Sequence, residues 1–233
     1  MKGLLLLFGE SFRWGGQHTR DRGRYVSYPA QIDASKSHKR WIDHTKQKYH
    51  ADINVSINSY TTRFDDDLTS IYLLDLKKSI FYPEMIGQNG LIQRCIQHLK
   101  EDLKEYDFIL YMRIDLYLKD TFFDIFDPTW DKIMFPSICF EPHHKCGPHP
   151  RVNDMMMFIP KKYFSHLNVG LGHDSWYNLI ERQSLTYEDL DTMLNTYHDS
   201  DSGKDFNPIY FIVNRPEESN HLTTRSIFNK YNF

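Results

Sequence analysis

The pattern of apolar and polar positions is clearest at the start of the chain. Five apolar residues, Leu4 to Phe8, form an unbroken run that ends at Gly9. Such a run predicts a strand that is covered on both faces of a sheet. The segment ADINVSINSY alternates apolar and polar positions, which predicts a second strand with one apolar side. The short segment SIFYP is a candidate third strand.

Three segments in the first half of the chain have helical character. Residues 28–49 are polar with few apolar anchors, and residues 64–72 begin with a run of aspartates that suits the positive end of a helix. The range 90–106 has an apolar residue at every fourth position, which gives one apolar stripe. The residues of this stripe are Leu91, Cys95, Leu99 and Leu103.

The second half of the chain is more irregular. Residues 108–112 and the segments DKIMFP, MMMFIP and IYFIVNRP read as strands. Residues 161–167 and 187–197 are expected to be helices, the second with Leu190 and Leu194 facing inward. Strands that alternate with helices indicate an α/β fold with a mostly parallel central sheet flanked by helices.

Composition narrows the class of protein. A chain of 233 residues that is 40% hydrophobic can bury one large core, so we expect a single domain over residues 1–233. A net charge of −3 without any run of lysine and arginine argues against nucleic-acid binding. Three cysteines, an odd number, favour a reducing compartment. The first apolar run is too short for a membrane span, and we expect a cytoplasmic protein.

Candidate chemistry is found where three predicted strands end. Parallel sheets bind ligands beyond the carboxyl ends of their strands, and these ends are residues 9–13, 59–63 and 113–115. The loop after the first strand is rich in glycine and arginine, which suits phosphate oxygens. The alternative is a solvated basic loop.

Arg113 and Asp115 follow the buried strand 108–112 and lie on one side of an extended chain. The carboxylate of Asp115 suits a hard cation such as Mg²⁺ or Mn²⁺. Arg113 could instead neutralise a diphosphate leaving group directly. The alternative for both residues is an internal ion pair.

Two further carboxylate motifs have a functional and a structural interpretation. Asn153 and Asp154 precede the strand MMMFIP, and the carboxylate could bind a sugar hydroxyl or accept its proton. The alternative is a local loop cap. Asp199 and Asp201 form a literal Asp-x-Asp, which we expect to be a turn, with a substrate contact as the rival interpretation.

These stretches together resemble a known family. The strand YDFILYMRIDLYL is similar to the strand that ends in the Asp-x-Asp motif of glycosyltransferases of the GT-A fold. The stretches LLLLFGESFRWGGQHTRDRG, NSYTTRFDD and RVNDMMMFIP resemble small glycosyltransferase domains of large DNA viruses of algae (chloroviruses), which modify capsid glycoprotein. The likeness covers roughly residues 4–216. It implies a nucleotide-binding half, about 1–120, and an acceptor-side half, about 121–233.

The resemblance implies roles for individual residues. It implies a nucleotide-sugar donor, most simply a UDP-sugar, and Mn²⁺ or Mg²⁺ held by Asp115 and completed by His221. Arg113 departs from the family pattern because it replaces the first acid of the motif, which puts metal dependence in doubt. Nucleotide contacts are implied for Gly9, Ser11, Arg13, Tyr60 and Thr61, and sugar or acceptor contacts for Asn153 and Asp154.

The sequence therefore predicts a hexosyl- or deoxyhexosyltransferase that acts on a hydroxyl of a glycan or glycoprotein, in the host cytoplasm if the protein is viral. Two alternatives stay open. One is a sugar nucleotidyltransferase. The other is a non-catalytic glycan-binding module on the same fold. No nucleic-acid partner and no membrane span are expected.

Overall fold

A computed structural model gives the positions of most of the chain. The residues that it describes are 1–12, 27–84, 86–136, 138–139, 151–152, 155–169, 185–193 and 210–212.

The centre of the structure is a seven-stranded sheet with the strand order β10-β6-β9-β4-β1-β2-β3. Parallel pairing joins β1 to both β2 and β4, and it also joins β2 to β3 and β6 to β10. Of the seven, β9 alone runs antiparallel to its neighbours. The predicted α/β class with a mostly parallel sheet is therefore confirmed. The strands are β1 Lys2–Phe8, β2 Asp52–Tyr60, β3 Leu76–Tyr82, β4 Phe108–Arg113, β6 Ile133–Phe135, β9 Met156–Pro160 and β10 Leu190–Thr192.

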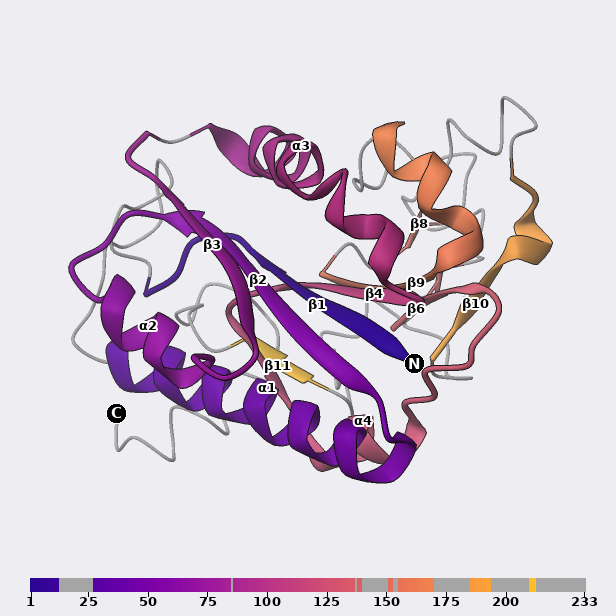
Figure 1. Ribbon diagram of the computed structural model, residues 1–233, viewed down its shortest axis with the longest axis horizontal. Helices are drawn as coiled ribbons and strands as arrows, with labels where there is room; N and C mark the ends of the chain where they lie inside the picture. The colour runs from indigo at the N-terminus through magenta and orange to yellow at the C-terminus, as the bar shows by residue number, and fades with distance from the viewer. Residues whose placement is uncertain are drawn as a thin grey trace.

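Helices cover both faces of this sheet (Figure 1). One face carries α1 (Ser27–Tyr49), α2 (Asp65–Ile71) and α4 (Asp120–Ile125). The other face carries α3 (Gly87–Leu99) and the 3₁₀ helix η2 (Lys161–Val169).

Short elements complete the described chain. Two small antiparallel pairs lie outside the main sheet, β5 with β11 and β7 with β8. Their bounds are β5 Leu116–Leu118, β7 Ile138–Cys139, β8 Arg151–Val152 and β11 Tyr210–Ile212, and the remaining 3₁₀ helices are η1 Asp102–Glu105 and η3 Tyr187–Asp189.

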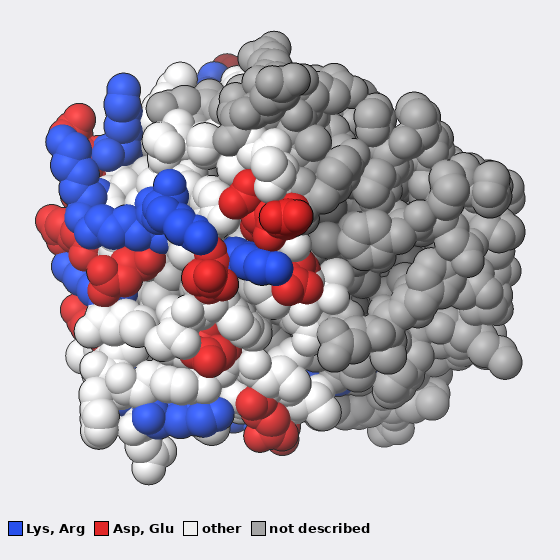
Figure 2. All heavy atoms as spheres, turned by 90° about the vertical axis from the view of Figure 1, so that its right-hand side faces the viewer, with Lys and Arg blue, Asp and Glu red and all other residues white. Residues whose placement is uncertain are grey.

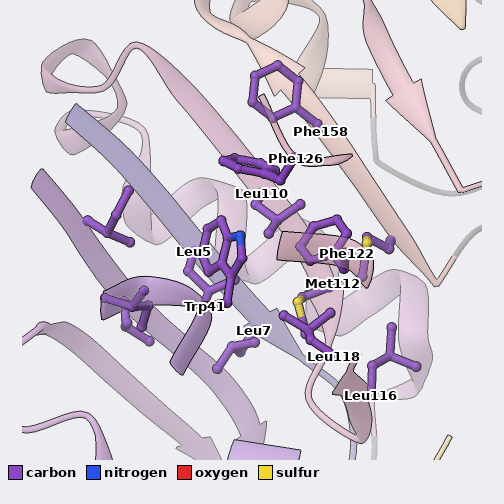
Figure 3. Close-up of a cluster of buried hydrophobic side chains, with 14 of the residues drawn as sticks. Leu5, Leu7, Trp41, Leu110, Met112, Leu116, Leu118, Phe122, Phe126 and Phe158 are labelled. Carbon is purple, nitrogen blue, oxygen red and sulfur yellow. The ribbon is translucent and has the colours of Figure 1, made fainter. Parts of the chain in front are cut away.

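Strand alternation divides the core into two clusters. In β1, Leu4 and Leu6 face α3, whereas Leu5 and Leu7 face α1. The α1 side is the more aromatic, and each fully buried leucine or phenylalanine there stabilises the fold by roughly 1.5–3 kcal/mol. Figure 3 shows this cluster, in which the labelled side chains are Leu5, Leu7, Trp41, Leu110, Met112, Leu116, Leu118, Phe122, Phe126 and Phe158.

Two predicted helices differ from the structure. The helix expected over 90–106 begins earlier, at Gly87, and ends at Leu99, after which η1 continues as a separate 3₁₀ turn. The helix expected over 187–197 is wrong. Its first residues form η3 and then β10, because Leu190 to Thr192 pair in parallel with β6, and this sheet pairing outweighs the helical spacing of two leucines.

The last predicted strand is confirmed in part. Tyr210 to Ile212 form β11, which pairs antiparallel with β5 outside the central sheet. Among the described residues, no helix is long and apolar enough to cross a membrane. On the face shown in Figure 2, basic and acidic side chains are interspersed over the described part of the surface.

Candidate functional site

Arg113 and Asp115 form a bidentate ion pair at the carboxyl end of β4. The guanidinium of Arg113 donates from Nε to Oδ1 of Asp115 over 2.8 Å and from an Nη to Oδ2 over 2.5 Å. The side chains are only 16% and 3% exposed. The pair joins residues two apart in sequence, so a sharp turn after β4 presents both charges together at the carboxyl end of the sheet.

The end of β1 lies directly beside this turn. The amide of Ile114 donates to the carbonyl of Phe8 over 2.8 Å, and the amide of Gly9 donates to the carbonyl of Asn58 over 3.2 Å. Gly9 has a φ of +112°, a conformation that residues with a Cβ rarely adopt. The glycine thus lets the chain turn away from the sheet between β4 and β2.

Serine side chains join the first and second strand ends. The amide of Ser11 donates to Oγ of Ser59 over 3.0 Å, and that hydroxyl donates to Oγ of Ser11 over 2.9 Å. Both serines are buried. Two residues after Ser59, the amide of Thr61 donates to the carbonyl of Tyr82 at the end of β3 over 3.0 Å. The three strand ends singled out in the sequence therefore lie side by side.

Two tyrosines stand together where β2 and β3 end. Tyr60 and Tyr82 are register partners, and both rings are buried against α3. Burial raises the pKa of Tyr60, whose hydroxyl faces the amides of Ile86 and Gly87 outside hydrogen-bond geometry. The hydroxyl of Tyr82 has no hydrogen-bond partner within the described residues. Tyr60 was expected here, and Tyr82 was missed although SIFYP was recognised as a strand.

The described residues do not fit a divalent cation at Asp115. Both carboxylate oxygens already accept hydrogen bonds from Arg113, whose positive charge would repel a second cation. Within the described parts of the chain, no group of three or more His, Cys, Asp or Glu side chains could hold a metal ion. Among the residues that the structure describes, Asp115 therefore has no neighbouring ligands of the kind that Mn²⁺ or Mg²⁺ prefers.

Helix α1 reaches the same edge with polar side chains that sequence reasoning missed. Gln31 bonds to the backbone at both Phe12 and Ile114, and His38 bonds to the backbone of Leu116. A signal for them existed in the sequence. Gln31 and His38 are seven residues apart and share one helix face with Ala34, so polar groups interrupt a face that should be apolar.

Four implied site residues lie outside the described residues. They are Arg13, Asn153, Asp154 and His221. The literal Asp199-x-Asp201 motif lies outside as well. Met155, which follows Asp154, is described, and its carbonyl accepts a hydrogen bond from the amide of Arg113 over 2.9 Å.

Comparison with known proteins gives structural likeness alone. No family model matches the chain, and no curated protein matches its sequence. Among solved structures, a Drosophila β1,4-galactosyltransferase 7 mutant in complex with manganese, UDP-Gal and xylobiose is similar with a TM-score of 0.42 and 14% identity. The match covers 84% of this chain and 65% of that one, so the chain spans less than two thirds of the galactosyltransferase.

Matches to two other solved structures cover most of this chain and most of the matched chain. A glucose-1-phosphate thymidylyltransferase from Bacillus anthracis has a TM-score of 0.46 and 15% identity over 83% of this chain and 87% of that one. A glycosyltransferase involved in glycosylation of the major capsid of PBCV-1 has a TM-score of 0.38 and 10% identity over 82% and 81%. Each TM-score is below 0.5, so none of these structures indicates a function for this chain.

Proposed function

We propose that the protein is a glycosyltransferase that moves a sugar from a nucleotide-diphosphate donor to a hydroxyl group of a glycan or glycoprotein. A UDP-sugar is the donor that we propose, and hexose or deoxyhexose is the proposed class of sugar. The single observation that carries the proposal is the meeting of three strand ends at one sheet edge, with the cation of Arg113 beside the Gly9 turn.

Each strand end has a proposed part in donor binding. The Gly9 turn and Ser11 lie where a nucleotide backbone can approach closely, because Gly9 carries no Cβ. Tyr60 and Thr61 at the end of β2 are proposed to flank the base or ribose, with the exposed Thr61 facing the ligand and the buried ring of Tyr60 behind it. Arg13 from the first loop is proposed to contact phosphate oxygens.

Arg113 is proposed to supply the positive charge that the leaving group needs. In the transfer, the acceptor oxygen forms a bond to the anomeric carbon while the bond from that carbon to the diphosphate oxygen breaks. The electron pair of the broken bond stays on the nucleoside diphosphate, so negative charge grows there. A guanidinium matches phosphate oxygens with two parallel hydrogen bonds. For this it must leave Asp115 in part.

The proton of the acceptor hydroxyl needs a base in an inverting reaction. Asp154 is proposed for that role, with Asn153 as a sugar contact. The hydrogen bond between Met155 and Arg113 supports this proposal, because it ties the residue after Asp154 to the end of β4. The resemblance also implies that Asp115 and His221 hold Mn²⁺ or Mg²⁺. The ion pair between Arg113 and Asp115 argues against this part of the proposal.

Calorimetric titration tests the proposal. UDP and GDP are titrated into the wild-type protein with Mn²⁺ and with EDTA, and then into Asp115→Ala and Arg113→Ala. Binding that survives EDTA and falls in Arg113→Ala supports the arginine as the phosphate cation. Binding that needs Mn²⁺ and is abolished in Asp115→Ala assigns a metal to Asp115 instead. If neither nucleotide binds, the transferase proposal fails.

The same closed ion pair favours one rival, a glycan-binding module that has lost catalysis. The one acid of this motif, Asp115, is neutralised by Arg113, and the described residues contain no group of side chains that could hold a metal for a metal-dependent reaction. Glycan-array binding without any nucleotide binding would support this rival. A nucleotidyltransferase is distinguished by release of diphosphate from a nucleoside triphosphate and a sugar phosphate.

A further inference from the structure

The inner face of α1 is polar where it meets β5. Gln31, Ser35, Ser37 and His38 are all fully buried. A helix that packs on a sheet normally buries apolar side chains, and a buried polar group costs free energy unless it is hydrogen-bonded. The partners of these four side chains therefore show what this face of the helix does.

Three of the side chains bond to the backbone of the segment from Ile114 to Leu118. Nε2 of Gln31 donates to the carbonyl of Ile114 over 2.8 Å, and Nε2 of His38 lies 2.5 Å from the carbonyl of Leu116. The amide of Leu118 donates to Oγ of Ser37 over 2.9 Å. Every second residue of this segment is thus held by α1, as a neighbouring strand would hold it.

The bonds around His38 have a defined direction. A carbonyl oxygen only accepts hydrogen bonds, so Nε2 of His38 carries the proton and Nδ1 accepts from the hydroxyl of Tyr72 over 2.7 Å. Burial lowers the pKa of His38 to about 4, in keeping with a neutral ring. The histidine therefore connects the turn after α2 to β5.

Gln31 connects two strand ends. Its Oε1 accepts from the amide of Phe12 over 3.4 Å, while its Nε2 donates to Ile114. Phe12 has a φ of +55°, a strained conformation for a residue with a Cβ, and its buried ring packs on Tyr28 and Phe64. One side chain thus fixes the end of the Gly9 loop against the turn that carries Arg113 and Asp115.

We propose that Gln31 and His38 are positioning residues that keep the site in register for a donor diphosphate. Gln31 holds the Gly9–Phe12 loop against the Arg113–Asp115 turn, and His38 holds the chain that leaves this turn at Leu116. The inference rests on the proposed function and adds to it the elements that set the geometry of the site. Neither residue touches the donor. Each acts through the backbone of residues beside the proposed donor contacts, Gln31 through Phe12 and Ile114 and His38 through Leu116.

The first test compares Gln31→Met with Ser37→Ala. Methionine keeps the length of the side chain but loses both backbone bonds. Ser37→Ala also removes two bonds, one to Leu118 at the far end of β5 and one to the carbonyl of Ala34 within α1. Both variants are expected to lower the melting temperature. Gln31→Met is expected to weaken UDP binding at least about tenfold, and Ser37→Ala to change it less than about twofold. Equal effects on affinity, or an unchanged affinity in Gln31→Met, would overturn the proposal.

The second test uses rescue at His38. Glutamine can still donate to the carbonyl of Leu116, whereas leucine cannot. His38→Gln is expected to retain UDP affinity within about threefold, and His38→Leu to lose about tenfold or more. A His38→Gln protein that folds with wild-type stability but binds UDP as poorly as His38→Leu would contradict a positioning role.

Hydrogen exchange measured by NMR separates this inference from the proposed function. In Gln31→Met, the amide of Phe12 loses its acceptor and is expected to exchange faster than in wild type. The amide of Ile114 keeps its bond to the carbonyl of Phe8 but is also expected to exchange faster, because the turn that contains it is no longer held at its carbonyl. In Ser37→Ala both amides are expected to stay protected. If wild type binds no nucleotide and these amides respond as expected, the positioning holds and the transferase proposal fails. If exchange at both amides is unchanged, the positioning inference is wrong whatever the protein binds.

Discussion

The guanidinium of Arg113 binds both carboxylate oxygens of Asp115 and shields them almost completely from solvent. The pair occupies the point where a second acid would make an Asp-x-Asp motif. Arg113 places one positive charge at this position, and its two hydrogen bonds to Asp115 hold the guanidinium at the carboxyl end of β4. Several consequences of this geometry can be measured.

Arg113→Asp is expected to convert nucleotide binding from metal-independent to metal-dependent. Two carboxylates then lie two residues apart and repel each other unless a divalent cation joins them. In EDTA, UDP affinity is expected to fall by about tenfold or more, and Mn²⁺ is expected to restore it. The measurement is calorimetric titration in the two buffers.

The matched control for this variant is Arg113→Asn, which removes the guanidinium without adding a carboxylate. It is expected to bind UDP weakly in both buffers. If Mn²⁺ restores Arg113→Asn as well as Arg113→Asp, the second acid contributes nothing and the comparison with an Asp-x-Asp motif is wrong.

Gly9→Ala is expected to destabilise the protein by about 1–2 kcal/mol and to weaken UDP binding. A Cβ at this position would meet nothing closer than Cγ2 of Ile114 at 4.0 Å, so the cost is conformational and arises from the φ of +112°. Urea unfolding and calorimetry measure the two effects. A variant with wild-type stability and affinity would show that the turn does not need its glycine.

Much of the fold could be predicted from local pattern. The run Leu4 to Phe8 and the alternation around Ile53 and Val55 identified β1 and β2, because burial on one or both faces leaves a direct imprint on the sequence. The segment around Leu190 was misread, because three residues of parallel pairing with β6 are a tertiary contact with no local signature.

The site was predicted less completely, for a related reason. Strand ends could be found from the sequence, and their adjacency follows from parallel pairing. Gln31 and His38 could not be assigned, because their function is to bond backbone groups more than seventy residues away. An α-helix with a polar inner face signals such bonds but does not name the partner.

Asp75→Asn is expected to destabilise the fold by about 2 kcal/mol without changing UDP affinity. Burial alone would raise the pKa of Asp75, but ion pairs with Lys46 and Lys39 of α1 lower it. Asp75 directly precedes β3, so it lies at the amino-terminal ends of the parallel strands, whereas the candidate site lies at their carboxyl ends. Asp43→Asn removes the exposed partner of Lys39 and is the control, with an expected loss below about 0.5 kcal/mol. Reduced UDP affinity in Asp75→Asn would contradict the prediction.

His38 is expected to make the protein less stable as the pH falls below its ordinary pKa. Burial lowers the pKa of the folded-state ring from 6.5 to about 4, whereas the hydrogen bond to Leu116 and the charge of Asp115 act in the opposite direction. Between these two values the unfolded chain binds more protons than the folded one. The free energy of unfolding therefore decreases from about pH 7 to pH 4, by on the order of 3 kcal/mol from this group.

Urea unfolding of wild type and His38→Gln across this pH range isolates the contribution. Glutamine does not titrate but can donate the same bond to Leu116, so the variant is expected to lose less stability between neutral and acid pH than wild type does. The two curves should converge toward low pH, where the wild-type ring must be protonated at a cost. Parallel curves would show that burial does not lower the pKa of His38 in the folded protein, and the loss of stability at acid pH would then come from other groups.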